Sequence, residues 1–392
     1  MERLHGPIRD YAWGSRSVLA QLQGRPVPAD GPEAELWLGA HPGGPGVVSR
    51  PAGPIPLPDL LAREPEHWLG GEVLRRFGPR LPFLLKILAP ERPLSLQAHP
   101  DAEQARAGYA AEEVAGVHRN YADPYHKPEL LVALQPFEAL CGFRDPAISA
   151  EVLAALRLDA LAPVVAALRT GVAGLAEAVR LLLTWPESER AGLVGAAVRA
   201  SAAPALAGRA DLVGRLARDY PDDPGVLVAL LLNEVRLAPD EAIWMPAGNL
   251  HAYLNGCGVE ILAASDNVLR GGLTPKRVDV PELLGVLRFE VLTDPVLKPE
   301  PLGPGLVTWP VPVEDFALRR ARVGGAEPVR LEPLGPRVVL CTEGRVTVGD
   351  AAGSVDLGPG AAAFGAAVAG PLSVDGDGEA YVASVADFPR SG

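Results

Sequence analysis

The stretch SLQAHPD, residues 95–101, decides how this sequence is best interpreted. Gln97 and His99 are two positions apart, so on a β-strand their side chains leave the same face. An amide oxygen and an imidazole nitrogen held side by side, followed by a proline that ends the strand, suit one half of a metal site. The alternative is a polar glutamine next to a surface histidine, and this stretch alone does not choose between the two.

Two other stretches favour the metal site. Residues 125–129, YHKPE, offer a carboxylate at Glu129, and residues 245–253, MPAGNLHAY, offer a second imidazole at His251. Together with the first pair they provide two nitrogen and two oxygen donors, a set that suits zinc with room for a substrate. We therefore predict one zinc ion bound by Gln97, His99, Glu129 and His251.

Length and composition limit the class of protein. A chain of 392 residues is long enough for two or three domains with a buried core. The net charge of −12 argues against nucleic acids and acidic membrane surfaces as partners. The 43 glycines and 41 prolines make up about a fifth of the chain, below the roughly 25–30 % that indicates disorder. Many short strands joined by turns are the better interpretation.

The cysteines, the first residues of the chain and the length of the apolar runs together indicate a cellular compartment. Cys141, Cys257 and Cys341 lie far apart and form no C-x-x-C pair, which is typical of a reducing cytosol rather than of a disulfide framework. The first residues, MERLHGP, lack the apolar region of a signal peptide, and runs such as residues 225–232 are too short to span a bilayer. We expect a cytoplasmic protein.

Lysine is used sparingly. The chain has four lysines against 32 arginines, so each lysine is expected where a guanidinium would not serve. Lysine is a compact cation whose pKa shifts on burial, whereas arginine is planar and stays charged. Lys86, Lys127 and Lys276 all lie near the stretches described above, and they predict a local anion site beside the metal.

The middle of the chain differs from both ends. From about residue 146 to 218 it is rich in Ala, Leu, Val and Arg, with apolar residues at helical spacing. Prolines divide this region into several helices; they are Pro163, Pro186 and Pro204. We predict a helical insertion over residues 146–225, which separates two parts of a catalytic domain, residues 1–145 and 226–300.

The remaining segments are mostly strand-like. We predict strands within residues 81–88, 129–134, 140–144, 235–237, 242–246, 259–262, 338–341 and 345–348, and a helix over residues 102–117. Asp101 and Gln104 would form the capping box of that helix. Strands and Gly/Pro turns around a metal suit a small barrel of the jelly-roll or cupin kind. The C-terminal domain, residues 301–392, has no histidine, so we expect it to be a metal-free, structural barrel.

The segment SDNVLRGGLTPK, residues 265–276, is not strand-like. It combines an acid, an amide, a guanidinium, two glycines and a lysine. Such a loop suits close backbone approach to an oxyanion or a phosphate, with Arg270 as a bidentate fork; the alternative is an exposed polar loop. His41, which precedes Pro42, is expected to be a turn residue rather than a ligand, and Trp37 to be core or pocket wall.

These motifs resemble those of the type I mannose-6-phosphate isomerases, a family of zinc-dependent cupin enzymes. The resemblance runs through residues 11–14, 35–42, 81–101, 125–129, 244–253 and 260–276. It implies that Gln97, His99, Glu129 and His251 bind zinc and that Arg270 is the active-site arginine. The implied fold is mainly β: a metal-bearing cupin barrel with a helical insertion and a second, metal-free cupin-like domain.

The implied reaction is the reversible isomerisation of mannose 6-phosphate and fructose 6-phosphate. A proton moves between C1 and C2 through a cis-enediol, which requires a base and positive charge near the developing oxygen anion. Arg270 is a poor base because its pKa lies above about 12, so we expect it to stabilise charge or hold the phosphate. The candidate bases are Lys127, Lys86, His126, Glu260 and a zinc-bound water. The candidates for substrate and phosphate binding are Ser95, Lys86, Lys127, Asp266 and Lys276.

Two other functions are compatible with parts of the pattern. Two histidines and a carboxylate also form the iron site of cupin dioxygenases, but Gln97 would occupy a position that oxygen needs. A sugar-binding cupin without activity would not need the Arg/Lys loop beside a metal. We expect a hexose 6-phosphate as the only partner, with no nucleic acid or membrane, and a monomer or weak homo-oligomer. The product would enter carbohydrate metabolism and GDP-mannose biosynthesis.

Overall fold

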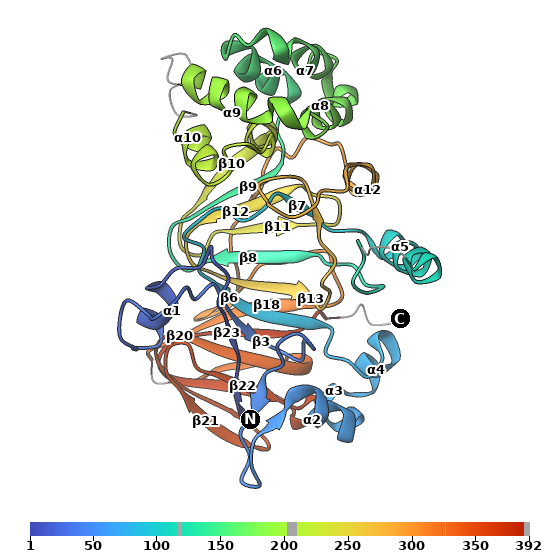
Figure 1. The fold of residues 1–392 in the computed structure, drawn as a ribbon. Helices are drawn as coiled ribbons and strands as arrows, with labels where there is room; N and C mark the ends of the chain where they lie inside the picture. Colours follow the sequence, from blue (N-terminus) through green and yellow to red (C-terminus); the bar gives the residue numbers. More distant parts are fainter. Residues whose placement is uncertain (117–119, 202–209, 326, 388–392) are drawn as a thin grey trace.

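The computed structural model describes residues 1–116, 120–201, 210–325 and 327–387. The described strands form three antiparallel sheets. In Figure 1 the helical region lies at one end of the molecule, two smaller sheets lie in the middle, and the largest sheet lies at the other end. The prediction of a mainly β chain with a helical insertion is confirmed.

The two smaller sheets pack face to face and enclose a shared core. One of them has the order β15 (Val296–Leu297), β11 (Ala242–Met245), β8 (Glu129–Ala133), β13 (Gly258–Ala263), β6 (Phe83–Leu88), β3 (Glu35–Leu38) and β2 (Ile8–Arg9). The other has the order β10 (Leu232–Leu237), β9 (Phe137–Phe143), β12 (His251–Asn255), β7 (Gln97–Ala98) and β14 (Leu269–Arg270). One apolar cluster draws buried side chains from both sheets, among them Leu131, Met245 and Phe137. This pair of sheets is the barrel that the sequence predicted.

The largest sheet contains most of the C-terminal region. Its order is β16 (Glu300–Gly303), β17 (Leu306–Thr308), β18 (Ala317–Val323), β23 (Leu372–Val385), β20 (Leu334–Asp350), β22 (Ala362–Gly365), β1 (Glu2–His5), β4 (Val47–Val48) and β5 (Ile55–Pro56). In addition, β19 (Val329–Leu331) pairs with β23, and β21 (Gly353–Leu357) pairs with β20. Three N-terminal strands therefore belong to this sheet, although residues 1–145 were assigned to the catalytic domain. Strand pairing between distant segments leaves no local pattern in the sequence; the division into domains stays a prediction.

Helices cover the ends and edges of the sheets. The insertion contains α6 (Pro146–Ala155), α7 (Ala162–Leu168), α8 (Leu175–Leu183), α9 (Glu187–Ser201), α10 (Ala210–Asp219) and α11 (Gly225–Val228), with short 3₁₀ turns η1 (Asp159–Leu161), η2 (Gly171–Gly174) and η4 (Ala229–Leu231). The others are α1 (Val18–Leu22), α2 (Leu57–Arg63), α3 (Pro65–Leu69), α4 (Gly71–Phe77), α5 (Ala102–Ala115), α12 (Val280–Val286) and η5 (Ala367–Ala369). Pro163 lies in the first turn of α7, and Pro186 directly precedes α9, as expected; Pro204 lies outside the described residues.

The start of α5 confirms the predicted capping box. The Asp101 carboxylate accepts hydrogen bonds from the backbone N–H groups of Glu103 and Gln104, and the Gln104 side chain accepts one from the Asp101 backbone. The helix ends at Ala115, earlier than predicted, because Gly116 adopts a left-handed conformation with φ 60°. Residue 117, the predicted end, lies outside the described residues.

The strands predicted within residues 235–237 and 242–246 are confirmed as β10 and β11, which belong to different sheets. Two local predictions need correction. Residues 338–348 belong to one long strand, β20, whose pairing with β23 shifts register between Cys341 and Glu343 while the strand itself continues. The loop of residues 265–276 contains the short strand β14, which pairs with β7.

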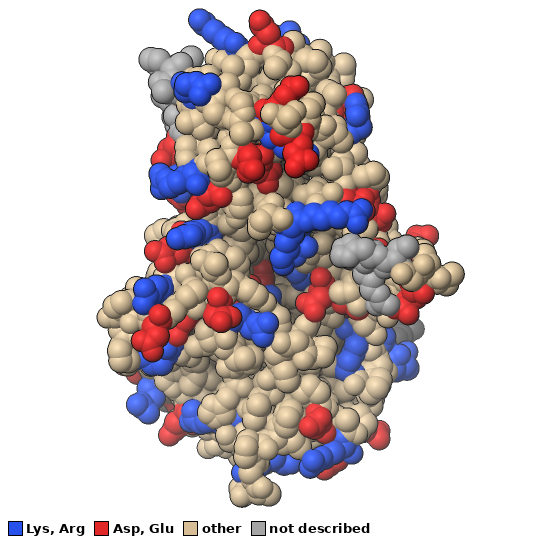
Figure 2. Space-filling model, viewed as in Figure 1, with Lys and Arg blue, Asp and Glu red and all other residues tan. Residues whose placement is uncertain are grey.

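No helix in the described ranges is long and apolar enough to cross a membrane. On the face seen in Figure 2, Lys and Arg side chains are interspersed with Asp and Glu. A hollow near the middle of that face is bordered by basic side chains.

Candidate metal centre

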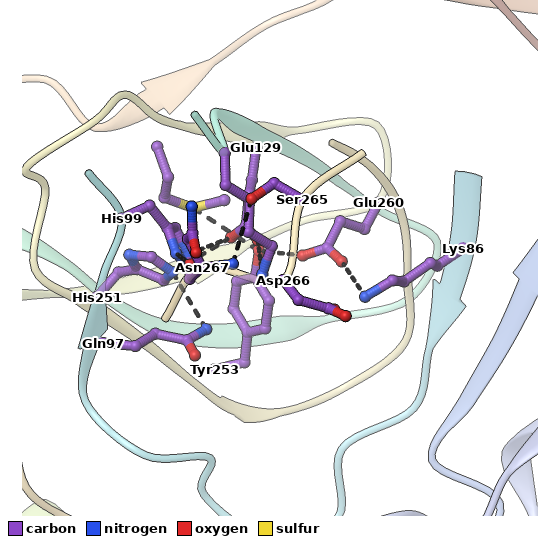
Figure 3. Close-up of polar contacts among 12 residues, drawn as sticks. Lys86, Gln97, His99, Glu129, His251, Tyr253, Glu260, Ser265, Asp266 and Asn267 are labelled. Carbon is purple, nitrogen blue, oxygen red and sulfur yellow. Dashed lines mark hydrogen bonds and ion pairs between the residues drawn. The ribbon is translucent and has the colours of Figure 1, made fainter. Parts of the chain in front are cut away.

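Three donor side chains converge inside the barrel. His99 follows β7, Glu129 begins β8, and His251 begins β12, and all three are buried. The Nε2 atoms of His99 and His251 each lie 3.3 Å from Oε2 of Glu129. Donor atoms of the three residues all lie within 4.8 Å of one another, a group that could hold a metal ion. Figure 3 shows them gathered on one side of the site, with Gln97 beside them.

Backbone hydrogen bonds fix how both imidazole rings face the cluster. Nδ1 of His99 lies 2.7 Å from the carbonyl oxygen of Asn267, and Nδ1 of His251 lies 3.0 Å from that of Asn249. A carbonyl only accepts, so each Nδ1 carries the proton and each Nε2 presents a lone pair to the cluster. This arrangement is the usual support of metal-ligating histidines.

The cluster has the charge and the spacing that a divalent cation requires. Two imidazole lone pairs facing a carboxylate oxygen repel one another unless a cation lies between them. Nε2 of His99 and Oε2 of Glu129 are buried without a hydrogen-bond partner. Four ligands placed tetrahedrally at zinc bond lengths would lie roughly 3.3 Å apart, which matches the separations of His99 and His251 from Glu129.

Gln97 completes the set. It lies directly opposite His251 across β7 and β12, and its Nε2 is 3.3 Å from Nε2 of His251. A half-turn of the amide would exchange its nitrogen and oxygen and bring Oε1 to the cluster. The residues present therefore fit a zinc ion with two nitrogen and two oxygen donors.

Protonation states agree with metal binding. Burial is the main cause that lowers the pKa of His99 to about 4, so its ring is neutral at pH 7. Burial acts to raise the pKa of Glu129, but Lys127 and His99 outweigh it and hold this pKa well below its usual range. Nζ of Lys127 lies 2.9 Å from Oε1 of Glu129, which leaves Oε2 for the cluster.

A second charged group lies on the neighbouring strands of the same interior face. Lys86 is directly opposite Glu260 in the pairing of β6 with β13, and Nζ of Lys86 lies 3.5 Å from Oε2 of Glu260. Burial, reinforced by Glu129, raises the pKa of Glu260 to about 7 in spite of Lys86. The hydroxyl of Tyr253 donates a 2.8 Å hydrogen bond to Oε1 of Glu260.

Arg270 lies on the facing sheet, in line with Gln97 and His251. Its register partner on β7 is Gln97, whose other partner is His251 on β12, so the three side chains leave the same face. The residues before Arg270 are fastened by Asn267, whose side-chain oxygen accepts the Ala122 N–H at 2.7 Å. The same side chain donates to the Tyr125 carbonyl at 2.8 Å.

The remaining candidates lie at varying distances from the cluster. Ser95 is half-buried and precedes Leu96, which exchanges backbone hydrogen bonds with the glycines after Arg270. Asp266 is mostly exposed, and its Oδ2 lies 3.0 Å from Nε2 of His41. Lys276 is exposed. His126 is not one of the three cluster residues, and its Nε2 lies 2.9 Å from Oδ2 of Asp315 in the C-terminal region.

Sequence reasoning missed several residues of the site. Glu35 is buried beside Lys86, Tyr253 holds Glu260, and Asn267 supports His99. A buried lysine implies a carboxylate partner, but only the strand register identifies which one. His41 does occupy a turn, where its Nδ1 accepts the Gly43 N–H at 3.1 Å, and it also binds Asp266.

The barrel and its cluster define a class, that of the metal-binding cupins. A family description, "Phosphomannose isomerase type I, catalytic domain", matches residues 1–146. The mannose-6-phosphate isomerase of Escherichia coli (strain K12) is 38 % identical over 400 residues, which cover 96 % of this chain and 98 % of that protein. The chain therefore belongs to the mannose-6-phosphate isomerase family.

Solved structures agree with this placement. A crystal structure of a variant phosphomannose isomerase from Salmonella typhimurium has a TM-score of 0.88 and 32 % identity and covers 98 % of this chain and 99 % of that one. A mannose 6-phosphate isomerase bound with zinc and yttrium has a TM-score of 0.87 and 32 % identity, with the same coverage.

Proposed function

We propose that this chain interconverts mannose 6-phosphate and fructose 6-phosphate, with one zinc ion held by Gln97, His99, Glu129 and His251. The observation that carries the proposal is the convergence of unpartnered donor atoms from His99 and Glu129 with Nε2 of His251. The relatives named as mannose-6-phosphate isomerases and the zinc-bound structure support the substrate and the metal.

Zinc, when bound, supplies a positive charge that can polarise a substrate oxygen. The side chains of this chain then divide the remaining tasks. Lys127 neutralises the second oxygen of Glu129 and adds positive charge near the sugar. Arg270, in line with Gln97, faces the same interior space and stabilises either the enediolate oxygen or the phosphate.

Glu260 is our candidate for the group that moves the proton between C1 and C2. A carboxyl group with a pKa of about 7 can both take and release a proton at neutral pH. Lys86 is a poorer candidate: although burial opposes its charge, Glu35 and Glu260 raise its pKa above the ordinary value. His126 is also a poorer candidate, because its ring is bonded to Asp315.

The phosphate is proposed to lie toward Ser95 and Arg270, with Asp266 and Lys276 at the rim. Binding energy from this distant group would position the sugar carbons for proton transfer. We further propose that the protein acts in the cytoplasm on small hexose phosphates, without nucleic-acid or membrane partners, and that its product supplies GDP-mannose biosynthesis.

The test is a coupled assay of fructose 6-phosphate formed from mannose 6-phosphate, with zinc content measured on the same samples. His251→Ala should lose bound zinc and lower the rate by more than about a hundredfold. Removing a ligand should weaken zinc binding more than removing a residue that only hydrogen-bonds to a ligand. His67→Ala removes an exposed histidine on α3 and should change neither quantity. Wild-type activity in His251→Ala would refute the proposal.

A further inference from the structure

Lys86 sits between two carboxylates, and only one of them adjoins the metal cluster. Strand register places Trp37, Lys86 and Glu260 side by side on β3, β6 and β13. Glu35 lies two residues before Trp37 on β3, so its side chain is on the same face. Nζ of Lys86 lies 3.4 Å from Oε2 of Glu35 and 3.5 Å from Oε2 of Glu260. Figure 3 shows Lys86 pointing toward Glu260.

The two carboxylates have different surroundings. Glu260 accepts a hydrogen bond from Tyr253, a neighbour of the cluster, and lies close enough to Glu129 for the two charges to interact. Glu35 is 7 % exposed, and within the described residues its polar partners are the indole N–H of Trp37 and the Lys86 ammonium. Within the described residues, the Glu35 carboxylate is therefore shared between Trp37 and Lys86.

Trp37 helps to hold the Lys86 ammonium in two ways. Its Nε1–H donates a hydrogen bond to Oε2 of Glu35 and so holds the carboxylate in place. Its ring centroid lies 4.9 Å from Nζ of Lys86, so the ring face also stabilises the cation. An ammonium held by one fixed carboxylate and one aromatic face has little freedom to move.

Two carboxylates beside Lys86 can divide two tasks: one exchanges a proton with the substrate, and the other compensates the charge of the lysine. A single carboxylate could not do both. A group that exchanges a proton with the substrate loses its negative charge for part of the cycle, and a lysine paired with it alone would then be an uncompensated buried cation. A second carboxylate that takes no part in the proton exchange removes this conflict.

We infer that Glu35 is a positioning residue: it holds the Lys86 ammonium in place and charged toward the substrate, so that Glu260 is free to exchange protons. The inference rests on the proposed isomerase function. Glu35 acts through Lys86 and does not touch the reacting atoms.

The test compares Glu35→Gln with Glu33→Gln in the holoenzyme. Glu35→Gln keeps the side chain's size and an oxygen for the Trp37 N–H but removes the charge, and should lower kcat by about ten- to a hundredfold with zinc content unchanged and KM altered less. Glu33 lies two residues earlier and pairs with Arg25 outside the site, so Glu33→Gln should match the wild type. Glu35→Asp, which keeps the charge, should recover part of kcat.

A double variant excludes a merely structural role. If Glu35 acts through Lys86, Glu35→Gln added to Lys86→Met should lower kcat no further than Lys86→Met alone. Additive losses would overturn the inference, as would a Glu35→Gln enzyme with wild-type kcat. Should Glu35→Gln fail to fold, Trp37→Phe removes the N–H donor to Glu35 and leaves a smaller aromatic ring beside Lys86, and it must still lower kcat. A wild-type protein without isomerase activity would instead refute the proposed function.

Discussion

The charged residues of this site divide into groups with a fixed charge and one carboxyl group whose pKa lies near neutrality, which we propose exchanges protons. Lys86 and Arg270 belong to the first kind: carboxylates hold Lys86 charged, and a guanidinium stays charged at neutral pH even though burial lowers the pKa of Arg270. Glu260 belongs to the second kind, because burial brings its pKa to about 7.

The pH dependence of the rate should follow Glu260. A base acts in its ionised form, so kcat/KM should rise as the pH increases through an acidic limb at or below about 7; bound zinc adds positive charge and moves the limb lower. A pH–rate profile of the wild type and Glu260→Gln checks this, and the variant should be slow and lack the limb. A limb of the same midpoint and depth in the variant would assign it to another group, such as the substrate phosphate.

Arg270 should stabilise charge without carrying the proton. If it holds the phosphate, Arg270→Ala should mainly raise KM; if it faces the enediolate, kcat should fall with little change in KM. Arg270→Lys should keep part of the activity in both cases, because a cation remains. Steady-state kinetics distinguish the two roles. Should Arg270→Lys remove or move the limb of the pH profile that belongs to the base, while the variants of all candidate bases leave it in place, then Arg270 is the base.

The sequence was most informative at this scale where residue types are chemically restrictive. The four proposed zinc ligands were selected from donor type and spacing, and the structure brings His99, Glu129 and His251 together with Gln97 beside them. Glu35 and Asn267 escaped notice, because their roles depend on which strands and loops become neighbours.

At the scale of elements, strand register aligns the side chains of the site in two rows. His251, Gln97 and Arg270 are abreast on β12, β7 and β14, and Lys86 and Glu260 are abreast on β6 and β13. A slip of one residue in any of these pairs would turn its side chain to the opposite face.

The loop between β13 and β14 should be as important for zinc binding as a ligand's own strand. The Asn267 side chain bonds Ala122, Asp123 and Tyr125, and its carbonyl fixes His99. Asn267→Ala should lower the free energy of unfolding by about 3 kcal/mol, because buried polar partners lose their bonds. Urea unfolding and a zinc titration measure both effects, and zinc affinity should fall about ten- to a hundredfold. Unchanged stability and affinity would contradict this role.

Elements with local signals were predictable, and those made by pairing were not. The α5 capping box and the buried strand β6 follow from residues within a few positions of one another. The strand β14 has only two residues, and its existence depends on its partner β7. The unbroken course of β20 depends likewise on its long pairing with β23.

At the scale of the whole molecule, the C-terminal region contacts the segment that leads into the site, although this region has no histidine. Asp315, 4 % exposed, contacts His126, the residue before Lys127. Trp309 donates a 2.9 Å hydrogen bond to the Asp240 carbonyl beside β11. The region we expected to be structural therefore also restrains the segment that carries Lys127 and Glu129.

Removing this restraint should slow the enzyme without removing its metal. Asp315→Asn weakens the bond to His126, so unfolding should become easier by about 1 kcal/mol and kcat should fall several-fold, with zinc retained. Thermal unfolding, kinetics and metal analysis check the three parts. Glu314→Gln, which alters the neighbouring exposed carboxylate paired with Arg76, is the control. Equal kcat values for the two variants would show that the contact does not matter for catalysis.

Long-range pairing also explains what the sequence could not give at this scale. Three N-terminal strands, β1, β4 and β5, join the C-terminal sheet. Only β1 pairs with a distant strand, β22, more than 300 residues away, and β4 and β5 extend the sheet from β1. The short sequence of β1 carries no signal for that partner. The helical insertion, by contrast, was recognised from composition and helical spacing alone.

The central claim is that one zinc ion in the barrel supports sugar-phosphate isomerisation. The most direct measurement is the rate of fructose 6-phosphate formation from mannose 6-phosphate while zinc is added stepwise to the chelated, metal-free protein. We predict a negligible rate without zinc and a linear rise that stops at one equivalent of zinc per chain. Full activity of the metal-free protein, or activity that does not respond to zinc, would contradict the account.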